Sequence, residues 1–238
     1  LTNKFLSNIA DKIAISFPGW NAKKTILTGN PVRPEIKGIS KHEGIDKINA
    51  MNGDFSLREE IFTILVFGGS QGSSTVNTGI ASCLERMEPL RNEFQLIHIS
   101  GEKDFIWLKK IYEVKKYNAV VFPYIHSMGF AYACADLVIC RSGAMTVAEL
   151  IALKKPAILI PYRYSTNAHQ EYNARFLQER GAAILIREEE FECDRIINTL
   201  TNIIKNPSQL SSMKKVLSEI EIEDSGKKLA KIITDLLY

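Results

Sequence analysis

Two hydrophobic patterns alternate along most of the chain. From residue 61 onwards, short and mostly apolar runs are separated by longer segments whose apolar side chains recur every three or four positions. The short runs predict buried β-strands, because a strand that is covered on both faces has little need of polar positions. The predicted strands cover residues 61–67, 95–99, 119–122, 137–140, 157–160 and 183–186.

The segments between these runs predict helices. In residues 73–88, for example, Val76, Ile80 and Leu84 recur with a helical repeat and would form one apolar face. The predicted helices cover residues 73–88, 103–115, 126–134, 144–153, 168–180, 193–205, 207–220 and 225–237. Strands that alternate with helices predict right-handed crossovers, and therefore an α/β fold with a doubly wound parallel sheet.

The first 60 residues do not follow this alternation. We predict a short amphipathic helix over residues 1–10 and strands over residues 12–17 and 25–28. The next segment, residues 29–34, reads Gly-Asn-Pro-Val-Arg-Pro, and its two prolines favour a stiff, extended connector between domains. Residues 35–60 are polar and irregular, and no regular element is predicted there.

Composition narrows the class of protein. The 238 residues allow one large or two small domains, and 45% hydrophobic with 24% charged residues is typical of a globular protein. A net charge of +3 is too small to indicate a nucleic-acid partner, and no apolar run approaches the roughly 18–20 residues that span a bilayer. The four cysteines are scattered without a CxxC motif, so we expect buried free thiols in a reducing compartment.

Residues 140–149, Cys-Arg-Ser-Gly-Ala-Met-Thr-Val-Ala-Glu, are the first candidate for chemistry. They lead from a predicted strand through a tight turn into a predicted helix. Such a turn directs unpaired N–H groups and the positive helix end over the carboxyl edge of the sheet, where open α/β sheets bind ligands. Glu149, one turn into the helix, could accept hydrogen bonds from a vicinal diol such as ribose. The alternative is an ordinary strand–helix joint with a solvated glutamate.

Two other turns follow predicted strands. Residues 68–72, Gly-Gly-Ser-Gln-Gly, resemble a phosphate-binding turn, because glycines let the backbone approach an anion closely. They match neither GxGxxG nor GxxxxGK[ST], and a purely structural tight turn remains the alternative. Further along the chain, His169, Gln170 and Asn173 stand at a predicted helix start, where they could bond sugar hydroxyls or simply form a solvated cap. The sequence has no metal-ligand spacing, no Asp-x-Asp and no GxSxG motif.

Taken together and in order, these three turns and the Gly-Asn-Pro-Val-Arg connector resemble the GT-B glycosyltransferases of family 28 that add N-acetylglucosamine to lipid I. The resemblance covers nearly the whole chain. It implies two Rossmann-like domains that face each other across a cleft, the C-terminal one binding UDP-N-acetylglucosamine without a cofactor or bound metal. The implied reaction is an inverting transfer to the C4 hydroxyl of MurNAc in lipid I, which forms lipid II for peptidoglycan synthesis. The implied location is peripheral, at the cytoplasmic face of the bacterial inner membrane.

The resemblance also implies roles for single residues. Glu149 would hold the ribose hydroxyls, and the backbone of Ile125 would meet the uracil edge. The start of the helix at residue 144 would line the phosphates and sugar, and His169 with Gln170 would bond the sugar hydroxyls. The full set of residues implied to face the donor is Arg33, Ser70, Ile125, Ala144, Met145, Thr146, Glu149, His169 and Gln170.

One part of the family pattern is missing from the sequence. The glycine-rich acceptor loop and the proposed general base of the family's N-terminal domain have no match, so we expect no catalytic residue within this chain. The implied division is a tail of the N-terminal acceptor domain over residues 1–30, a linker and irregular lead-in over 31–60, the UDP-sugar-binding domain over 61–222, and a returning helix over 223–238. The acceptor and membrane contacts would belong mainly to the absent part.

We therefore expect the chain alone to bind the donor and to transfer nothing. Two alternatives stay open. One is a partner-dependent, donor-binding subunit of a two-chain N-acetylglucosaminyltransferase. The other is an enzyme similar to the UDP-sugar 2-epimerases, which would need catalytic carboxylates and histidines from both domains.

Overall fold

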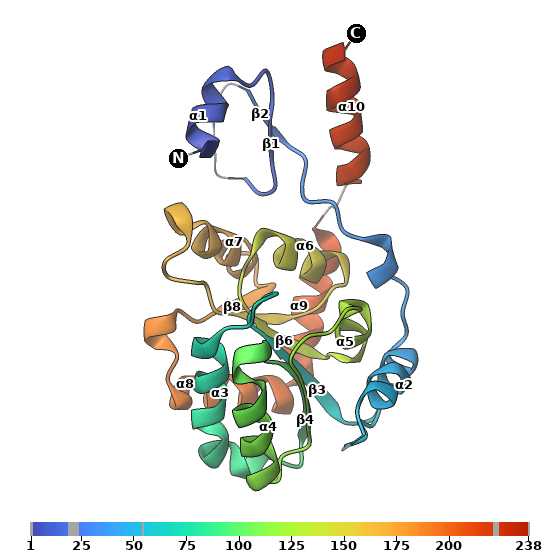
Figure 1. Ribbon diagram of the computed structural model, residues 1–238, viewed down its shortest axis with the longest axis vertical. Helices are drawn as coiled ribbons and strands as arrows, with labels where there is room; N and C mark the ends of the chain where they lie inside the picture. The colour runs from blue at the N-terminus through green and yellow to red at the C-terminus, as the bar shows by residue number, and fades with distance from the viewer. Residues whose placement is uncertain (1, 19–23, 54, 221–223, 238) are drawn as a thin grey trace.

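A six-stranded parallel sheet lies at the centre of the larger part of the molecule (Figure 1). The computed structural model describes residues 2–18, 24–53, 55–220 and 224–237. The strand order is β5-β4-β3-β6-β7-β8, and every neighbouring pair is parallel. The strands are β3 (Phe62–Phe67), β4 (Phe94–Ile99), β5 (Ala119–Phe122), β6 (Leu137–Cys140), β7 (Ala157–Leu159) and β8 (Ala183–Leu185). This confirms the predicted α/β fold with a doubly wound parallel sheet.

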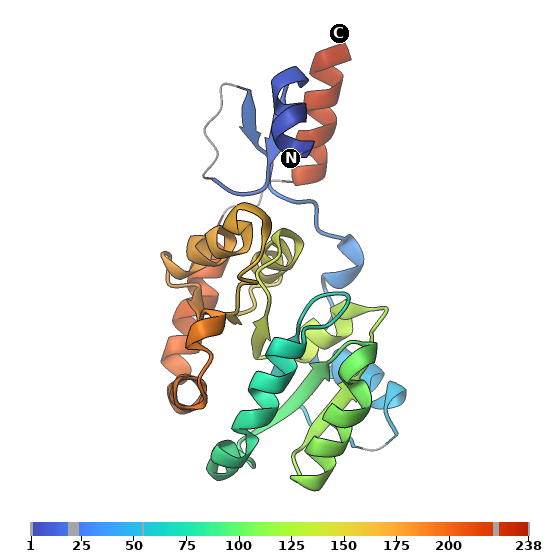
Figure 2. The same cartoon turned by 60° about the vertical axis from the view of Figure 1, so that its left-hand side comes forward.

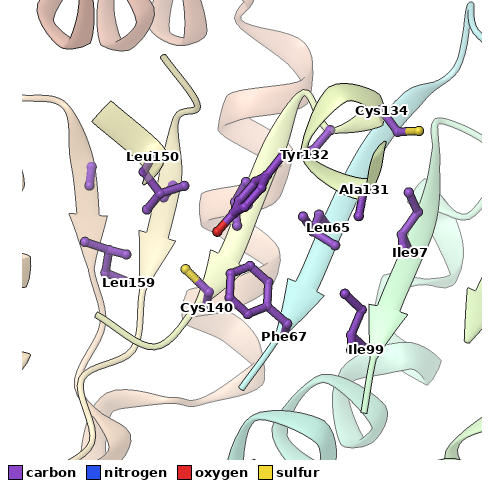
Figure 3. Close-up of a cluster of buried hydrophobic side chains, with 14 of the residues drawn as sticks. Leu65, Phe67, Ile97, Ile99, Ala131, Tyr132, Cys134, Cys140, Leu150 and Leu159 are labelled. Atoms are coloured by element: carbon purple, nitrogen blue, oxygen red, sulfur yellow. The ribbon is translucent and has the colours of Figure 1, made fainter. Parts of the chain in front are cut away.

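Helices cover both faces of the sheet, because successive side chains of a strand point to opposite sides. On one face, Ile64 and Val66 of β3 pack against α3, α4 and α8. On the other face, Leu65 and Phe67 pack against α2, α5, α6, α7 and α9, and Figure 3 shows part of this second core. The helices are α2 (Lys41–Met51), α3 (Ser74–Met87), α4 (Phe105–Val114), α5 (Met128–Cys134), α6 (Ala144–Ala152), α7 (His169–Gln178), α8 (Cys193–Lys205) and α9 (Pro207–Glu219).

The first and last elements lie apart from this sheet. Helix α1 (Thr2–Ile9) and the parallel pair β1 (Ile13–Ile15) and β2 (Thr25–Leu27) lie at the same end of the molecule as α10 (Ser225–Leu237), as Figures 1 and 2 both show. Apolar side chains on α1 and α10 are exposed there, among them Phe5 and Ile233. The expected boundary at residues 222–223 lies outside the described residues.

Helix α2 corrects the prediction that residues 35–60 contain no regular element. Ser40 caps it by accepting a hydrogen bond from the Glu43 N–H at 3.1 Å. Its buried residues face α5, and Gly44 lies so close to that helix that an added Cβ would approach Ala133 to 2.9 Å. Packing against α5 therefore stabilises a helix whose own apolar periodicity is weak.

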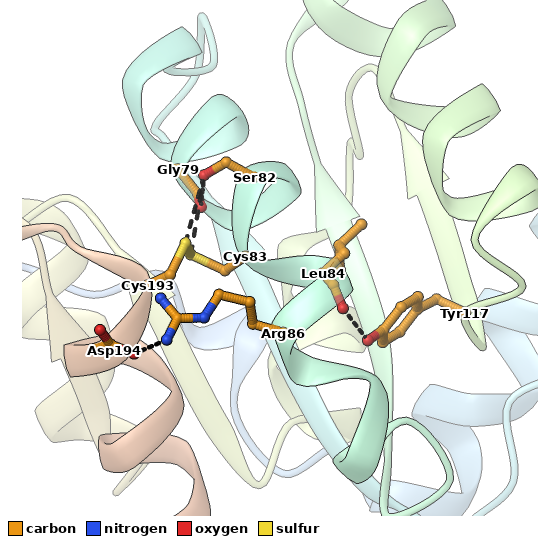
Figure 4. The surroundings of a disulfide bond; sticks show 8 residues. All are labelled: Gly79, Ser82, Cys83, Leu84, Arg86, Tyr117, Cys193 and Asp194. Atoms are coloured by element: carbon orange, nitrogen blue, oxygen red, sulfur yellow. Dashed lines mark hydrogen bonds and ion pairs between the residues drawn. A yellow bond between two sulfur atoms is a disulfide. The ribbon is translucent and has the colours of Figure 1, made fainter.

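The expectation of four free thiols is wrong for two cysteines. Cys83 of α3 and Cys193 of α8 form a disulfide, with their Cα atoms 5.0 Å apart (Figure 4). The two helices are neighbours on one face of the sheet, which a separation of 110 residues in sequence does not reveal. Cys134 and Cys140 are free and buried, as expected.

Candidate functional site

The candidate site lies where the strand order reverses. β3 and β6 are neighbours, and Phe67 pairs with Cys140 at their carboxyl ends. The chain then continues to α3 on one face of the sheet and to α6 on the other, so the two loops diverge from neighbouring strand ends. In open α/β sheets this switch point is where ligands bind.

The loop after β3 depends on its glycines. Gly69 and Gly72 have φ angles of 102° and 76°, and the Gly72 N–H donates to the Gly69 carbonyl at 3.0 Å. A Cβ at Gly72 would lie 2.1 Å from the carbonyl oxygen of Ser100, which leaves no room for a side chain. Ser70 is exposed within the turn, at the carboxyl edge of the sheet, and its contact with the donor stays a prediction.

The loop after β6 leads into an uncapped helix. Gly143 stands at the N-cap of α6 and offers no side-chain oxygen, so the first N–H groups of the helix have no side-chain cap. Those N–H groups belong to the stretch that contains Ala144, Met145 and Thr146, and Met145 is well exposed. An uncapped helix start carries a partial positive charge and open donors, which suit an anionic group.

Glu149 lies one turn further into α6 and is only 6% exposed. Its Oε2 accepts a hydrogen bond from the Tyr132 hydroxyl at 2.9 Å, and its Oε1 lies 3.7 Å from Nη2 of Arg33. Arg33 comes from the connector and is largely exposed. The structure thus brings together two residues that the sequence analysis placed near the same ligand, and adds Tyr132, to which it gave no role.

The start of α7 is tied directly to the loop after β6. The Ser142 hydroxyl donates to the Gln170 carbonyl at 2.8 Å, and Asn173 Nδ2 donates to the Ser142 carbonyl at 3.0 Å. Gln170 Oε1 accepts from the Tyr162 N–H at 3.0 Å. His169 is exposed, and because its Nδ1 faces the Thr166 carbonyl at 2.8 Å, that nitrogen must carry the proton.

Ile125 lies further along the same edge, in the loop after β5. The whole residue is only 4% exposed and its side chain packs in the core on the α5 side of the sheet, so the expected contact of its main chain with the uracil stays a prediction. The rings of Tyr124 and His126 flank it and meet edge to face, with centroids 5.0 Å apart.

Arg141 is a buried residue of this site to which the sequence analysis gave no role. Its Nη1 donates to the carbonyls of Ile160 and Pro161, both at 3.1 Å, and its Nη2 donates to the Ser73 hydroxyl at 2.8 Å. The same Nη2 forms an ion pair with Glu188. Arg141 therefore joins the ends of β6 and β7 to the start of α3. Its place within the 140–149 motif is the signal that could have pointed to it.

A buried polar network supports the glycine loop from below. Asn77 Nδ2 donates to the Ser100 carbonyl and to Asp104, both at 2.8 Å, and its Oδ1 lies 3.0 Å from Nε2 of His98. Burial lowers the pKa of His98 to about 3, so the ring is neutral. Ser100 is the residue against which Gly72 packs, and the network thereby fixes the floor of the loop.

The described ranges contain neither a metal-binding cluster nor a membrane-spanning helix. No three His, Cys, Asp or Glu side chains there gather into a group that could hold a metal ion, and the metal-free, cofactor-free donor site stays a prediction. No helix in that part of the chain combines the length and apolar character needed to cross a bilayer.

Comparison with known proteins gives a consistent result. Residues 63–232 match the family described as "Glycosyltransferase family 28 C-terminal domain". The chain is 37% identical over 243 residues to the UDP-N-acetylglucosamine--N-acetylmuramyl-(pentapeptide) pyrophosphoryl-undecaprenol N-acetylglucosamine transferase of Acetivibrio thermocellus. It is 38% identical over 241 residues to the protein of that name in Thermodesulfovibrio yellowstonii. Both alignments cover the whole of this chain, which spans 64% of each relative.

Solved structures agree on the fold. The crystal structure of Acinetobacter baumannii MurG superposes with a TM-score of 0.75 at 24% identity, covering 99% of this chain and 63% of that one. The UDP-GlcNAc 2-epimerase of Neisseria meningitidis has a TM-score of 0.53 at 16% identity, covering 82% of this chain and 48% of that one. At these identities the likeness extends to the fold alone.

Proposed function

The chain belongs to glycosyltransferase family 28, and from this membership we propose that it binds UDP-N-acetylglucosamine at the switch point between β3 and β6. In this proposal it is the donor-binding part of an N-acetylglucosaminyltransferase. The names of the relatives at 37% and 38% identity support this donor and this transfer.

Each part of the donor has a suitable counterpart in the site. The uncapped start of α6 suits the diphosphate, since its open N–H groups and helix dipole favour negative charge. Glu149 suits the ribose diol, and the main chain at Ile125 suits the uracil edge. His169 and Gln170, at the start of α7, suit the hydroxyls of the sugar. Ser70 and Arg33 would approach the donor from the glycine loop and the connector.

The proposed reaction is an inverting displacement. The C4 hydroxyl of an undecaprenyl-linked MurNAc-pentapeptide loses its proton to a base and attacks the anomeric carbon, and UDP departs. The α6 N–H groups would stabilise the charge that develops on the leaving diphosphate. Because the acceptor named for the relatives is linked to undecaprenol, we place the reaction at a membrane surface, with the enzyme peripheral on the cytoplasmic face.

The observation that carries the proposal is the buried Glu149 carboxylate, one turn into a helix whose start is uncapped. Titration calorimetry with UDP tests it directly. We expect the chain to bind UDP, and Glu149→Ala to weaken binding by about 1–3 kcal/mol, the usual cost of a lost hydrogen bond to a charged acceptor. Glu113→Ala, which removes an exposed carboxylate from α4, is the matched control and should leave the affinity unchanged. Absence of UDP binding by the unmodified chain would contradict the proposal.

The same protein tests the expectation that the chain alone transfers nothing. Incubation with UDP-N-acetylglucosamine and a soluble analogue of the lipid-linked acceptor should yield no disaccharide product. Release of N-acetylmannosamine or of a 2-epimerised UDP-sugar from the donor alone would instead support the epimerase alternative.

A further inference from the structure

Tyr132 connects two loops of the candidate site through the protein interior. It belongs to α5, the helix that follows the Ile125 loop, and its hydroxyl reaches Glu149 of α6 at 2.9 Å. The side chain is almost fully buried, and its ring meets that of Phe67 edge to face at 5.9 Å. Figure 3 shows it in the same core as Cys140 and Leu150. Packing on these sides leaves the phenol little freedom, so the position of its hydroxyl is fixed by the fold.

The direction of this hydrogen bond is determined by chemistry. An ionised carboxylate only accepts, so the phenol must be the donor. Burial and the nearby Glu149 charge raise the pKa of Tyr132 well above its ordinary value, which keeps the proton on the phenol. The bond occupies Oε2 of Glu149, while Oε1 lies on the side of Arg33.

We propose that Tyr132 is a positioning residue that orients the Glu149 carboxylate toward the ribose diol and so makes the site selective for ribonucleotides. This inference rests on the proposed function. A glutamate side chain has three rotatable bonds, and Tyr132 removes the freedom of the last by holding one oxygen. Without the phenol, Oε2 loses its donor and, among the described residues, the carboxylate is held only by Arg33 on the side of Oε1, so its oxygens no longer face the diol in a fixed direction.

The test compares UDP with its 2′-deoxy and 3′-deoxy analogues, each of which lacks one hydroxyl of the diol. We expect the unmodified chain to bind UDP more tightly than at least one analogue. Tyr132→Phe should weaken UDP binding about 10-fold, the size of one hydrogen bond to a charged group, and leave the Kd of that analogue nearly unchanged. If Tyr132 merely supports the fold, Tyr132→Phe should weaken the binding of all three nucleotides by the same factor.

Tyr117→Phe is the matched control. Tyr117 is also buried, and its hydroxyl donates to the Leu84 carbonyl at 2.6 Å, away from the site (Figure 4). It should lower stability without changing selectivity among the nucleotides. If Tyr132→Phe weakens the binding of all three nucleotides equally, or leaves the ratio of their Kd values unchanged, the inference is wrong while the proposed function stands. If the unmodified chain does not distinguish UDP from either analogue, the ribose assignment of Glu149 falls, and the inference falls with it.

Loss of folding in Tyr132→Phe is also informative. In Tyr132→Phe/Glu149→Ala no carboxylate is left without its donor. If this double variant is as stable as Glu149→Ala while Tyr132→Phe alone is unfolded, the phenol acts through the carboxylate, as proposed. If the double variant is unfolded as well, the hydroxyl serves the fold in another way, and the inference is wrong.

Discussion

Arg141 and Glu188 form an ion pair whose side chains are only 8% and 10% exposed. Within the described residues, Glu188 Oε1 is buried without a hydrogen-bond partner, so the guanidinium charge is what compensates it. Taking both charges out of water is costly, and their attraction roughly offsets that cost only while both are present. This residue pair therefore contributes less to net stability than to fixing how the strand ends meet.

We predict that Arg141→Met lowers the free energy of unfolding by about 3–5 kcal/mol, because it leaves the Glu188 carboxylate buried without a counter-charge. Adding Glu188→Gln should recover much of that loss, since the neutral amide is cheaper to bury. Urea denaturation of the two variants and the parent gives the values. Equal stability of the single and double variants would show that the buried Glu188 carboxylate does not need the Arg141 charge.

His98 should make stability depend on pH. Its pKa is lowered from 6.5 to about 3 by burial. In the unfolded chain His98 therefore binds a proton as the pH falls below 6.5, whereas in the folded chain it stays neutral until about pH 3. Stability should fall as the pH falls through this window, by about 2 kcal/mol at pH 5 from this residue alone. The stability of His98→Gln relative to the parent should improve by that amount between pH 7 and pH 5. A constant difference would mean that His98 titrates normally.

At the scale of elements, what the sequence revealed depended on how each element is buried. The strands were predicted because burial on both faces leaves nearly unbroken apolar runs, as in β3. The three candidate turns were found because loops that follow parallel strands must meet at one edge. Helix α2 was missed because packing on α5 stabilises it. The Tyr132–Glu149 contact was missed because it depends on how α5 packs beside α6, which no local spacing reports.

The glycine loop gives a prediction at this scale, with a matched control in the same chain. Gly72 and Gly181 share a φ of 76°, but a Cβ at Gly181 would meet nothing within 4 Å, whereas one at Gly72 would meet the Ser100 carbonyl. Gly181→Ala should cost about 1–2 kcal/mol for the left-handed backbone alone. Gly72→Ala should cost clearly more and should also weaken UDP binding, because the loop must move. Thermal unfolding and calorimetry measure both effects; similar costs at the two sites would contradict the tight approach.

At the scale of the whole molecule, the switch point joins two separate cores. The face covered by α3, α4 and α8 contributes the glycine loop, and the opposite face contributes Tyr132, Glu149 and the start of α7. The site is therefore complete only when both layers are docked on the sheet. On the first face, the disulfide between Cys83 and Cys193 fastens α3 to α8 (Figure 4).

We predict that this disulfide raises the stability of the entire larger sheet. Its cysteines are 110 residues apart, and restricting the unfolded chain with a loop of this length gives an upper value of about 5 kcal/mol, of which disulfides typically deliver about 2–4 kcal/mol. Dithiothreitol should therefore lower the free energy of unfolding by that amount, and it should have no effect on Cys83→Ser/Cys193→Ser.

Thiol titration in denaturant gives an independent count, with two reactive cysteines before reduction and four after it. Four reactive thiols in the untreated protein, together with identical unfolding curves with and without reductant, would restore the free-thiol expectation. The α3–α8 contact would then rest on apolar packing, with Ile80 and Ile196 among the buried side chains of that face, and on the exposed ion pair between Arg86 and Asp194.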